Sequence, residues 1–419
     1  MKTSSVISLL TAVLPAIAAP NSINRREEPT FVEGKYIVQL KPGTSPEAVA
    51  THHSAVRSLL RRRDGAAGSV DKTFHIGNFN AYSGTFDDAT LAAISEFDEV
   101  LVVEPDQVIY VDATEGTSSL WKRALTTQTD SIWSLADLSH REAGAKDYVY
   151  DDTAGEGQTA YVFDTGIRLS HEEFEGRASF GINGVTGSTQ QTGSNSDTNG
   201  HGTHVAATIA GKNFGVAKKA KVVDVKVFDG NEGSTSAILT GIDWAVSDIV
   251  SKGAQKTSVL NLSLGGWGVT ALDNAVLAAY EQSVLSVVAA GNFNQPAADF
   301  SPARLPEAFT VGMTQRDRGR VNIIEDVYGS NYGPELDIFA PGRDIVSASH
   351  ISDTGTLTAT GTSMAAPLVA GLVCYLRGLE SNLGSPKEVT DRILEMAIRD
   401  VVTDPKGSPN LLVNNGNGR

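Results

Sequence analysis

Two different patterns of apolar and polar positions divide the chain near residue 124. Residues 36–111 contain short runs that alternate apolar and polar side chains, KYIVQL and FNAYSGTF, and a final extended run, VLVVEPDQVIYV. Between them lie two segments with helical spacing, SPEAVATHHSAVRSLLRR and DATLAAISEF. This order predicts a small α+β domain. The polar stretch DATEGTSSLWKR follows it and indicates an exposed linker that ends in a dibasic pair.

From Ala124 onward, continuous apolar runs alternate with helical segments. The runs are TAYVFDTG, AKVVDVKVFDG, SVLNLSLGG, VLSVVAAGN and LDIFAPG, and the helical segments include TSAILTGIDWAVSDIVSKG and TALDNAVLAAYEQS. Strands that are apolar throughout and separated by helices are typical of a doubly wound, mainly parallel sheet with helices on both faces. Four of the runs end in Asp-Thr-Gly, Asp-Gly, Gly-Gly or Gly-Asn, so we expect the site at the carboxyl ends of the strands.

The first 19 residues have the features of a secretory signal peptide, with one lysine, an apolar stretch and small residues at the end. We therefore expect a secreted, extracellular protein. Cys374 is the only cysteine in 419 residues, which excludes an internal disulfide. Its apolar helical surroundings predict a buried, inert thiol.

The charge and hydropathy of the chain limit the kinds of partner that it could bind. The formal net charge is −15, which argues against a nucleic-acid partner. Nothing after the leader has the length of uninterrupted apolar sequence that a spanning helix needs, so we expect no membrane partner. We expect a monomer.

Three residues could form a catalytic triad. Asp164 ends an apolar strand, His201 begins the helical segment HGTHVAATIAG, and Ser363 lies in GTSMAAPLVAG. An aspartate that orients a histidine, a histidine that accepts a proton and a serine that attacks are the three roles required. Each residue alone is also compatible with a structural role, as a turn aspartate, a helix-start histidine or a capping serine.

The blocks DTGI, GHGTHVA, VVAAGN and GTSMAAP occur in the order found in subtilisin-like serine proteases, and GVAKK, SLGG, SPA and SNYG resemble the proteinase K branch and its fungal alkaline proteases. The resemblance covers about residues 124–410. It implies a broad-specificity serine endopeptidase with Asp164, His201 and Ser363 as the triad. It also implies that Asn292 is the side-chain donor of the oxyanion hole.

The same resemblance implies where a substrate binds. Ser263, Leu264 and Gly265 match the strand that pairs with the substrate backbone, and the opposite wall of the primary specificity pocket matches Ala289, Ala290 and Gly291. Small, uncharged walls imply a preference for apolar or aromatic side chains before the cleaved bond. The sequence departs from the family motifs at Ala207, Ala366 and Leu368. These departures make the catalytic rate less certain than the mechanism.

The N-terminal unit resembles a subtilisin propeptide, which acts as a folding aid and temporary inhibitor. We therefore divide the chain into a signal peptide at 1–19, a propeptide at 20–123 with an inhibitor-like domain at about 36–111, and a peptidase domain at 124–419. The pair Lys122-Arg123 precedes ALTTQ, which resembles the start of mature fungal enzymes. Either a kexin-like enzyme or self-cleavage could make this cut.

A structural calcium ion is also implied by resemblance. SPARLPEAFTVG and ELDIFAPG match segments that hold calcium in proteinase K relatives, through carbonyls at the positions of Pro306 and Ala308 and the carboxylate of Asp337. Oxygen ligands suit this ion. The alternative is a surface aspartate without a metal.

Three other interpretations remain open. Asp-Thr-Gly occurs at both Asp164 and Asp353, the signature that aspartic proteases use to pair two carboxylates. His201 and His204 form a His-x-x-His pair, although no third metal ligand is evident. A homologue that has lost activity and survives as a binding protein is the non-enzymatic alternative.

Overall fold

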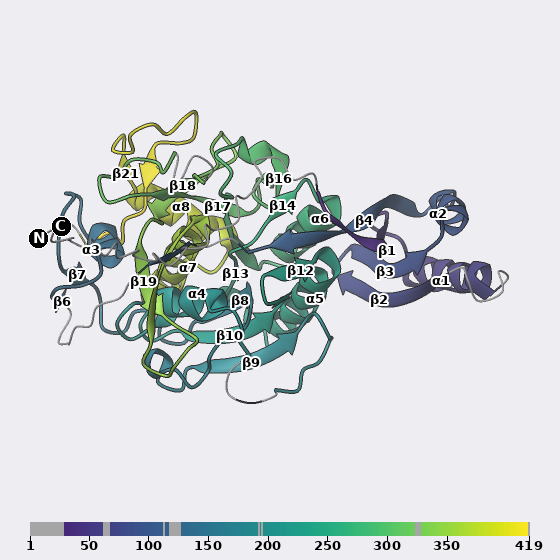
Figure 1. Cartoon of the computed structure of the whole chain (residues 1–419), viewed down its shortest axis with the longest axis horizontal. Coiled ribbons are helices and arrows are strands. Elements are labelled where there is room, and N and C mark those ends of the chain that lie inside the picture. Colours follow the sequence, from purple (N-terminus) through teal and green to yellow (C-terminus); the bar gives the residue numbers. More distant parts are fainter. Residues whose placement is uncertain are drawn as a thin grey trace, which may run out of the picture.

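The computed structural model describes residues 29–61, 68–111, 114–116, 127–191, 193, 196–322 and 328–417. These residues form a small N-terminal domain at one end of the longest axis and a larger domain that makes up the rest (Figure 1). The expected signal peptide and the Lys122-Arg123 pair lie outside the described residues.

The small domain is an antiparallel sheet with helices on its outer face. Its strands are β1 (Phe31–Leu40), β2 (Gly68–Ile76), β3 (Phe79–Phe86) and β4 (Val100–Tyr110), and its helices are α1 (Pro46–Arg61) and α2 (Asp88–Ser95). Alternation sends Val38 and Tyr82 toward the helices, where they pack with Val56 and Ile94. The opposite face, which includes Ile37, joins a core of the larger domain. The α+β prediction for this region is confirmed, although the sequence analysis did not identify β2.

The larger domain is built on a nine-stranded sheet with the order β21-β22-β18-β17-β15-β13-β8-β10-β9. Every neighbouring pair is parallel except β21 and β22. The strands are β8 (Thr159–Asp164), β9 (Ala178–Asn183), β10 (Lys221–Lys226), β13 (Ser258–Leu262), β15 (Leu285–Ala289), β17 (Phe309–Thr314), β18 (Ile338–Pro341), β21 (Ile398–Arg399) and β22 (Leu411–Leu412). The predicted doubly wound, mainly parallel fold is confirmed.

Helices cover both faces of this sheet. On one face α4 (His201–Ala210) and α7 (Thr362–Leu379) bury Val205 and Val369 against the strands. On the other face α5 (Thr235–Ser251) and α6 (Thr270–Glu281) bury Ile242 and Val276. Helices α3 (Trp133–Ser139) and α8 (Pro386–Met396) complete the domain. Among the described residues, α7 alone has the length and apolar character of a membrane span, and 89% of its apolar window is buried inside the fold.

Shorter strands complete the structure. They are β5 (Thr114–Gly116), β6 (Thr127–Gln128), β7 (Tyr148–Val149), β11 (Phe228–Asp229), β12 (Glu232–Ser234), β14 (Gly266–Trp267), β16 (Phe300–Ser301), β19 (Ile345–Ala348) and β20 (Thr356–Thr360). One of them, β5, precedes residue 124 and pairs antiparallel with β20 of the larger domain. Three short 3₁₀ helices are η1 (Glu172–Phe174), η2 (Gln255–Thr257) and η3 (Ala297–Asp299).

The order of the strands determines where a site can form. From β8 the chain passes to β10 and β9 on one side, whereas β13, β15 and β17 extend the sheet on the other side. Loops after neighbouring strands diverge at such a point and leave room above the sheet edge. Asp164 ends β8 and Ser263 follows β13, so both lie at this point.

Candidate active site

Asp164 and His201 form a hydrogen-bonded pair from two adjacent elements. Asp164 is the last residue of β8, and His201 is the first residue of α4, whose N-terminus follows Gly200 in a left-handed conformation. The Nδ1–H of His201 donates to Oδ1 of Asp164 at 2.7 Å, and the same oxygen accepts the backbone N–H of Thr165 at 2.8 Å. Both side chains are buried. The aspartate therefore fixes the tautomer that leaves Nε2 of His201 available as a base.

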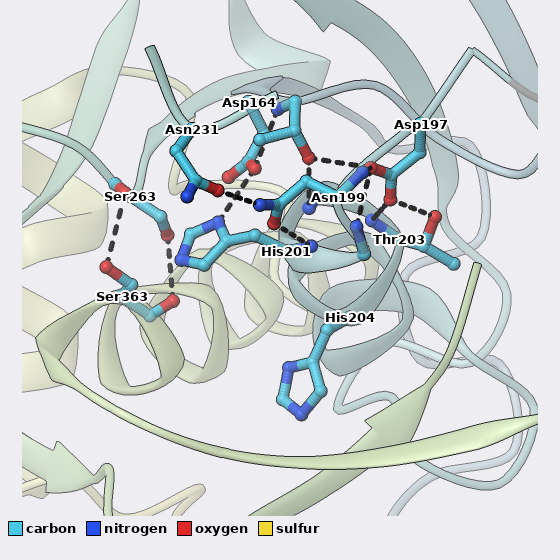
Figure 2. Close-up of polar contacts among 12 residues, drawn as sticks. Asp164, Asp197, Asn199, His201, Thr203, His204, Asn231, Ser263 and Ser363 are labelled. Carbon is cyan, nitrogen blue, oxygen red and sulfur yellow. Dashed lines mark hydrogen bonds and ion pairs between the residues drawn. The ribbon is translucent and has the colours of Figure 1, made fainter. Parts of the chain in front are cut away.

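Ser363 lies in the first turn of α7, and Figure 2 shows His201 extending toward that turn. Its Oγ donates to the carbonyl of Ser263 at 3.2 Å, while Oγ of Ser263 donates to the Ser363 carbonyl at 2.9 Å. These reciprocal bonds attach the start of α7 to the end of β13.

Asn292 is held by the residue that precedes Ser363. Its Oδ1 accepts the backbone N–H of Thr362 at 2.8 Å and the Thr362 hydroxyl at 2.9 Å. With its oxygen oriented in this way, the carboxamide directs its NH₂ group away from Thr362. Asn292 was predicted from its motif, whereas Thr362 was not, because nothing in GTSMA distinguishes an anchoring threonine from an ordinary helix-start residue.

The predicted pocket walls lie at the ends of neighbouring strands. Ser263, Leu264 and Gly265 follow β13, and Ala289, Ala290 and Gly291 end or follow the next strand, β15. Gly291 has a φ of +99°, and a Cβ there would lie 2.4 Å from Nδ2 of Asn331. Asn331 also donates to the carbonyl of Ala290 at 2.9 Å. This second wall therefore requires Gly291, which the sequence motif indicated, and Asn331, which was not predicted from the sequence.

Strand β4 of the small domain lies between β12 and β14 of the larger domain, and β14 directly follows the first wall. Strand β4 pairs with β12, and the N–H of Val111 donates to the carbonyl of Asn231 at 3.2 Å. On its other side, a Cβ on Gly266 would meet Gln107 Oε1 at 2.5 Å and Ile109 Cγ1 at 3.3 Å. The small domain thus places an extended segment between two strands of the larger one, as a bound peptide would lie.

Two carboxylates fix the small domain at helix N-termini of the larger one. Glu104 accepts the N–H of Ala271 at 2.8 Å at the start of α6, and Asp106 accepts the N–H of Ser236 at 3.1 Å at the start of α5. Anions are favoured at helix N-termini because the backbone amides there lack partners within the helix. Burial nevertheless raises the pKa of both carboxyls.

Ala308 and Asp337 lie at the beginnings of two paired strands, and Pro306 lies two residues before Ala308. Ala308 precedes β17 and Asp337 precedes β18, and Oδ2 of Asp337 accepts the N–H of Thr310 at 2.7 Å. Burial raises the pKa of the Asp337 carboxyl to about 7. A half-buried carboxylate whose ionised form is disfavoured fits a cation site completed by carbonyl oxygens. No group of three or more His, Cys, Asp or Glu side chains that could hold a metal occurs among the described residues.

The competing motifs have other partners. Asp353 binds Arg168 Nε at 2.6 Å and Ser170 Oγ at 2.6 Å, so it does not form a carboxylate pair with Asp164. His204 donates from Nε2 to the Ile345 carbonyl at 2.9 Å, and burial lowers its pKa to about 4. Cys374 is buried, which raises the pKa of its thiol to about 12. This burial agrees with the inert thiol that the sequence predicted.

The doubly wound fold carries a hydrogen-bonded Asp164–His201 pair near the helix turn that bears Ser363, and comparison with known proteins gives the family. The model of the Subtilase family matches residues 155–418, and the model of the Peptidase inhibitor I9 family matches residues 35–112. Alkaline protease 1 of Aspergillus oryzae is 45% identical over 417 residues, which are 98% of each chain. Alkaline proteinase of Hapsidospora chrysogena is 45% identical over 424 residues, which cover all of both chains.

Solved structures give the same family. A cold-adapted subtilisin-like serine proteinase matches 68% of this chain and 99% of its own, with 39% identity and a TM-score of 0.61. A protease from Pseudoalteromonas arctica matches 64% and 90%, with 28% identity and a TM-score of 0.52. The chain belongs to the subtilase family: it is a subtilisin-like serine endopeptidase with an I9-type propeptide domain, that is, a zymogen.

Proposed function

We propose that the protein is a secreted endopeptidase of broad specificity in which Asp164, His201 and Ser363 form the catalytic triad. The observation that carries the proposal is the 2.7 Å bond between Asp164 Oδ1 and His201 Nδ1, made beside the α7 turn that bears Ser363. Residues 1–19 supply the signal for secretion, and the relatives named above are alkaline proteases.

The reaction begins when the Ser363 hydroxyl leaves the Ser263 carbonyl and turns to Nε2 of His201. His201 takes the hydroxyl proton as Oγ attacks the peptide carbonyl, and Asp164 stabilises the imidazolium that forms. The imidazolium then gives its proton to the leaving amine, which leaves an acyl-enzyme ester on Ser363. A water molecule, deprotonated by His201, hydrolyses that ester and restores the serine.

The negative charge that develops on the substrate carbonyl oxygen is stabilised from two sides. Asn292 contributes its NH₂ group, which is directed by the two bonds from Thr362 to its oxygen. The N–H of Ser363 and the N-terminal end of the α7 dipole contribute from the other side. Donors that are fixed before the reaction do not have to reorganise as the charge appears.

The substrate lies where β4 now lies. Its backbone pairs with residues 263–265 as an added strand, and the side chain before the scissile bond enters between that segment and residues 289–291. Neither wall carries a charged side chain. Large apolar and aromatic residues are therefore preferred, because selection depends on burial of apolar area.

The I9-type domain acts as a temporary inhibitor of its own enzyme. In the maturation scheme we propose, residues 20–123 are removed and the peptidase begins at Ala124. Strand β4 occupies the substrate position until the domain is digested, and the carboxylates of Glu104 and Asp106 hold it there.

We also propose that a structural calcium ion binds Asp337 together with the carbonyls of Pro306 and Ala308. Such an ion supplies a positive charge beside the half-buried carboxylate, and it adds stability to a secreted fold that has no disulfide.

Hydrolysis of fluorogenic peptides by the purified, processed protein tests the proposed function. Activity that is abolished by a sulfonyl fluoride and by Ser363→Ala, but not by an aspartic-protease inhibitor, supports it. A correctly folded wild-type protein that binds peptides without cleaving them would instead identify the binding-protein alternative.

A further inference from the structure

Asp224 is a fully buried carboxyl group that the mechanism above does not use. It lies in β10, opposite Val162 of β8, while Lys226 on the same strand lies opposite Asp164. Because side chains alternate along a strand, Asp224 and Lys226 point to the same face of the sheet. Asp224 therefore lies two residues along the strand from the position that pairs with Asp164. Burial raises the pKa of Asp224 to about 7, which shows how unfavourable an ionised group is at this position.

The bonds of Asp224 join two separate segments. Its Oδ2 accepts the backbone N–H of Ile167 at 3.2 Å and also the hydroxyl of Ser196. Oγ of Ser196 in turn accepts the same Ile167 N–H at 3.0 Å. Oδ1 of Asp224 has no hydrogen-bond partner among the residues that the structure describes. Oδ2 alone therefore makes the hydrogen bonds by which Asp224 joins the two segments.

The joined segments are those that hold the catalytic pair. Ile167 ends the turn that begins at Asp164, and Ser196 begins the loop that leads to His201. Asp197 makes a second link between the same segments, since it accepts from Thr165 Oγ1 at 2.8 Å and from the N–H of Thr203 at 3.0 Å (Figure 2).

The charged neighbours of Asp224 are Asp197 and Lys226, which respectively disfavour and favour its ionised form. Lys226 donates from Nζ to the carbonyl of Thr165 at 2.6 Å, so it also holds the turn after Asp164. Two charged residues of β10 therefore bind this turn, Asp224 at Ile167 and Lys226 at Thr165.

We propose that Asp224 is a positioning residue that fixes the distance between Asp164 and His201 by attaching the 164–167 turn to the 196–201 loop. This inference depends on the triad proposed above. The Asp164–His201 bond spans those two segments, and a displacement of about 1 Å in a catalytic group can cost about 100-fold in rate. Asp224 contacts no substrate, so its loss acts on kcat and leaves KM unchanged.

Three variants test the proposal. Asp224→Leu removes the acceptor at similar size, and Asp224→Asn keeps an acceptor oxygen for Ile167 and Ser196. Val225→Ala is the matched control, because Val225 is equally buried on the same strand but belongs to the core on the opposite face. For each variant the active sites are titrated with a serine-directed fluorophosphonate, and kcat, KM and the melting temperature are measured on the same preparation.

We expect Asp224→Leu to lower kcat per titrated site by about tenfold or more, with KM within about twofold of wild type. Asp224→Asn should recover most of that loss, and Val225→Ala should lower the melting temperature while it keeps the wild-type kcat. Should Asp224→Leu fail to fold, Ser196→Ala removes one of the two bonds to Asp224 and should lower kcat in the same direction by a smaller factor.

Three results would overturn the positioning role: a wild-type kcat in Asp224→Leu, or in Ser196→Ala where that variant is used; an equal loss of kcat in the Asn and Leu variants; or an equal loss in Val225→Ala. Failure of the proposed triad is distinguishable, because the wild-type enzyme itself would then not be titrated by the fluorophosphonate.

Discussion

Asn292 accepts both hydrogen-bond donors of Thr362, the residue immediately before Ser363. The proposed oxyanion donor and the proposed nucleophile are therefore attached through one residue, although 70 positions separate Asn292 from Thr362. The Thr362 hydroxyl also accepts the N–H of Gly291 at 3.1 Å, which ties the second pocket wall to the same point.

Thr362→Val tests this attachment. Valine keeps the shape of the side chain but removes the hydroxyl, so Asn292 loses one of its two anchors and the Gly291 N–H loses its acceptor. A buried donor left without a partner costs about 1–3 kcal/mol, which should appear as a lower melting temperature. We expect kcat to fall by a factor of about three to ten while KM changes little, since the oxyanion donor becomes less well oriented. Thr362→Ser retains the hydroxyl and should stay closer to wild type in kcat; equal kcat in all three proteins would contradict the anchoring role.

Ser363→Ala should abolish turnover by about 10⁴-fold or more, because no other side chain can replace the nucleophile. If maturation is autocatalytic, the variant should also keep its I9-type domain, which intact-mass measurement of the secreted protein will detect. Efficient removal of the domain from Ser363→Ala would show that a separate protease makes the cut. Near-normal peptide hydrolysis by the folded variant would reject the triad.

The calcium proposal predicts a pH dependence with a definite sign. Burial raises the pKa of Asp337 from 3.8 to about 7, so the folded protein favours the protonated carboxyl. Stability from this group is fully present below the unfolded pKa and is lost as pH rises through the folded value. A bound cation removes that loss because it stabilises the carboxylate.

We therefore expect added calcium to raise the melting temperature more at pH 8 than at pH 5, and a chelator to reverse the gain. Asp337→Asn should remove most of this response and should show little dependence on pH between those values. Identical melting curves with calcium and with chelator at pH 8 would reject the site.

Specificity follows from the absence of charge in the two predicted walls. A peptide library should show cleavage after large apolar or aromatic residues. Two substrates that differ by one methylene before the cleaved bond should differ in kcat/KM by only about 10- to 200-fold, because apolar pockets discriminate weakly. A strict requirement for Arg or Lys would contradict this interpretation of residues 263–265 and 289–291, since it would need an acidic group there.

Most of the architecture could be predicted from the sequence because buried parallel strands are apolar along their whole length. The runs that end at Asp164, Leu262 and Ala289 were recognised for that reason. Strand β17 was not identified, since FTVGMT is a short run interrupted by Gly312. The structure explains that glycine: a Cβ there would lie 2.6 Å from Cε1 of Phe339 on the next strand.

The candidate site was only partly predictable. Asp164, His201 and Ser363 lie within local motifs, so their neighbours in sequence identify them. The contacts that orient the site, such as Thr362 with Asn292 or Asp224 with Ile167, join residues 70 and 57 positions apart. Each partner is an ordinary polar residue in its own segment, and only the fold brings the two together.

Asn292→Leu is the direct test of the oxyanion donor. The amide of Asn292 should bind the substrate oxygen more strongly in the transition state than in the bound substrate, so its removal acts on kcat. We expect kcat to fall by roughly 10²- to 10³-fold with little change in KM. Leucine is a better replacement than aspartate, which would add a repelling charge as well as delete the donor. A purely structural asparagine would give the opposite result, a lower melting temperature with unchanged turnover per active site. Measuring kcat, KM and melting temperature on one titrated preparation separates the two roles, and a stable variant with wild-type kcat would exclude Asn292 from the mechanism.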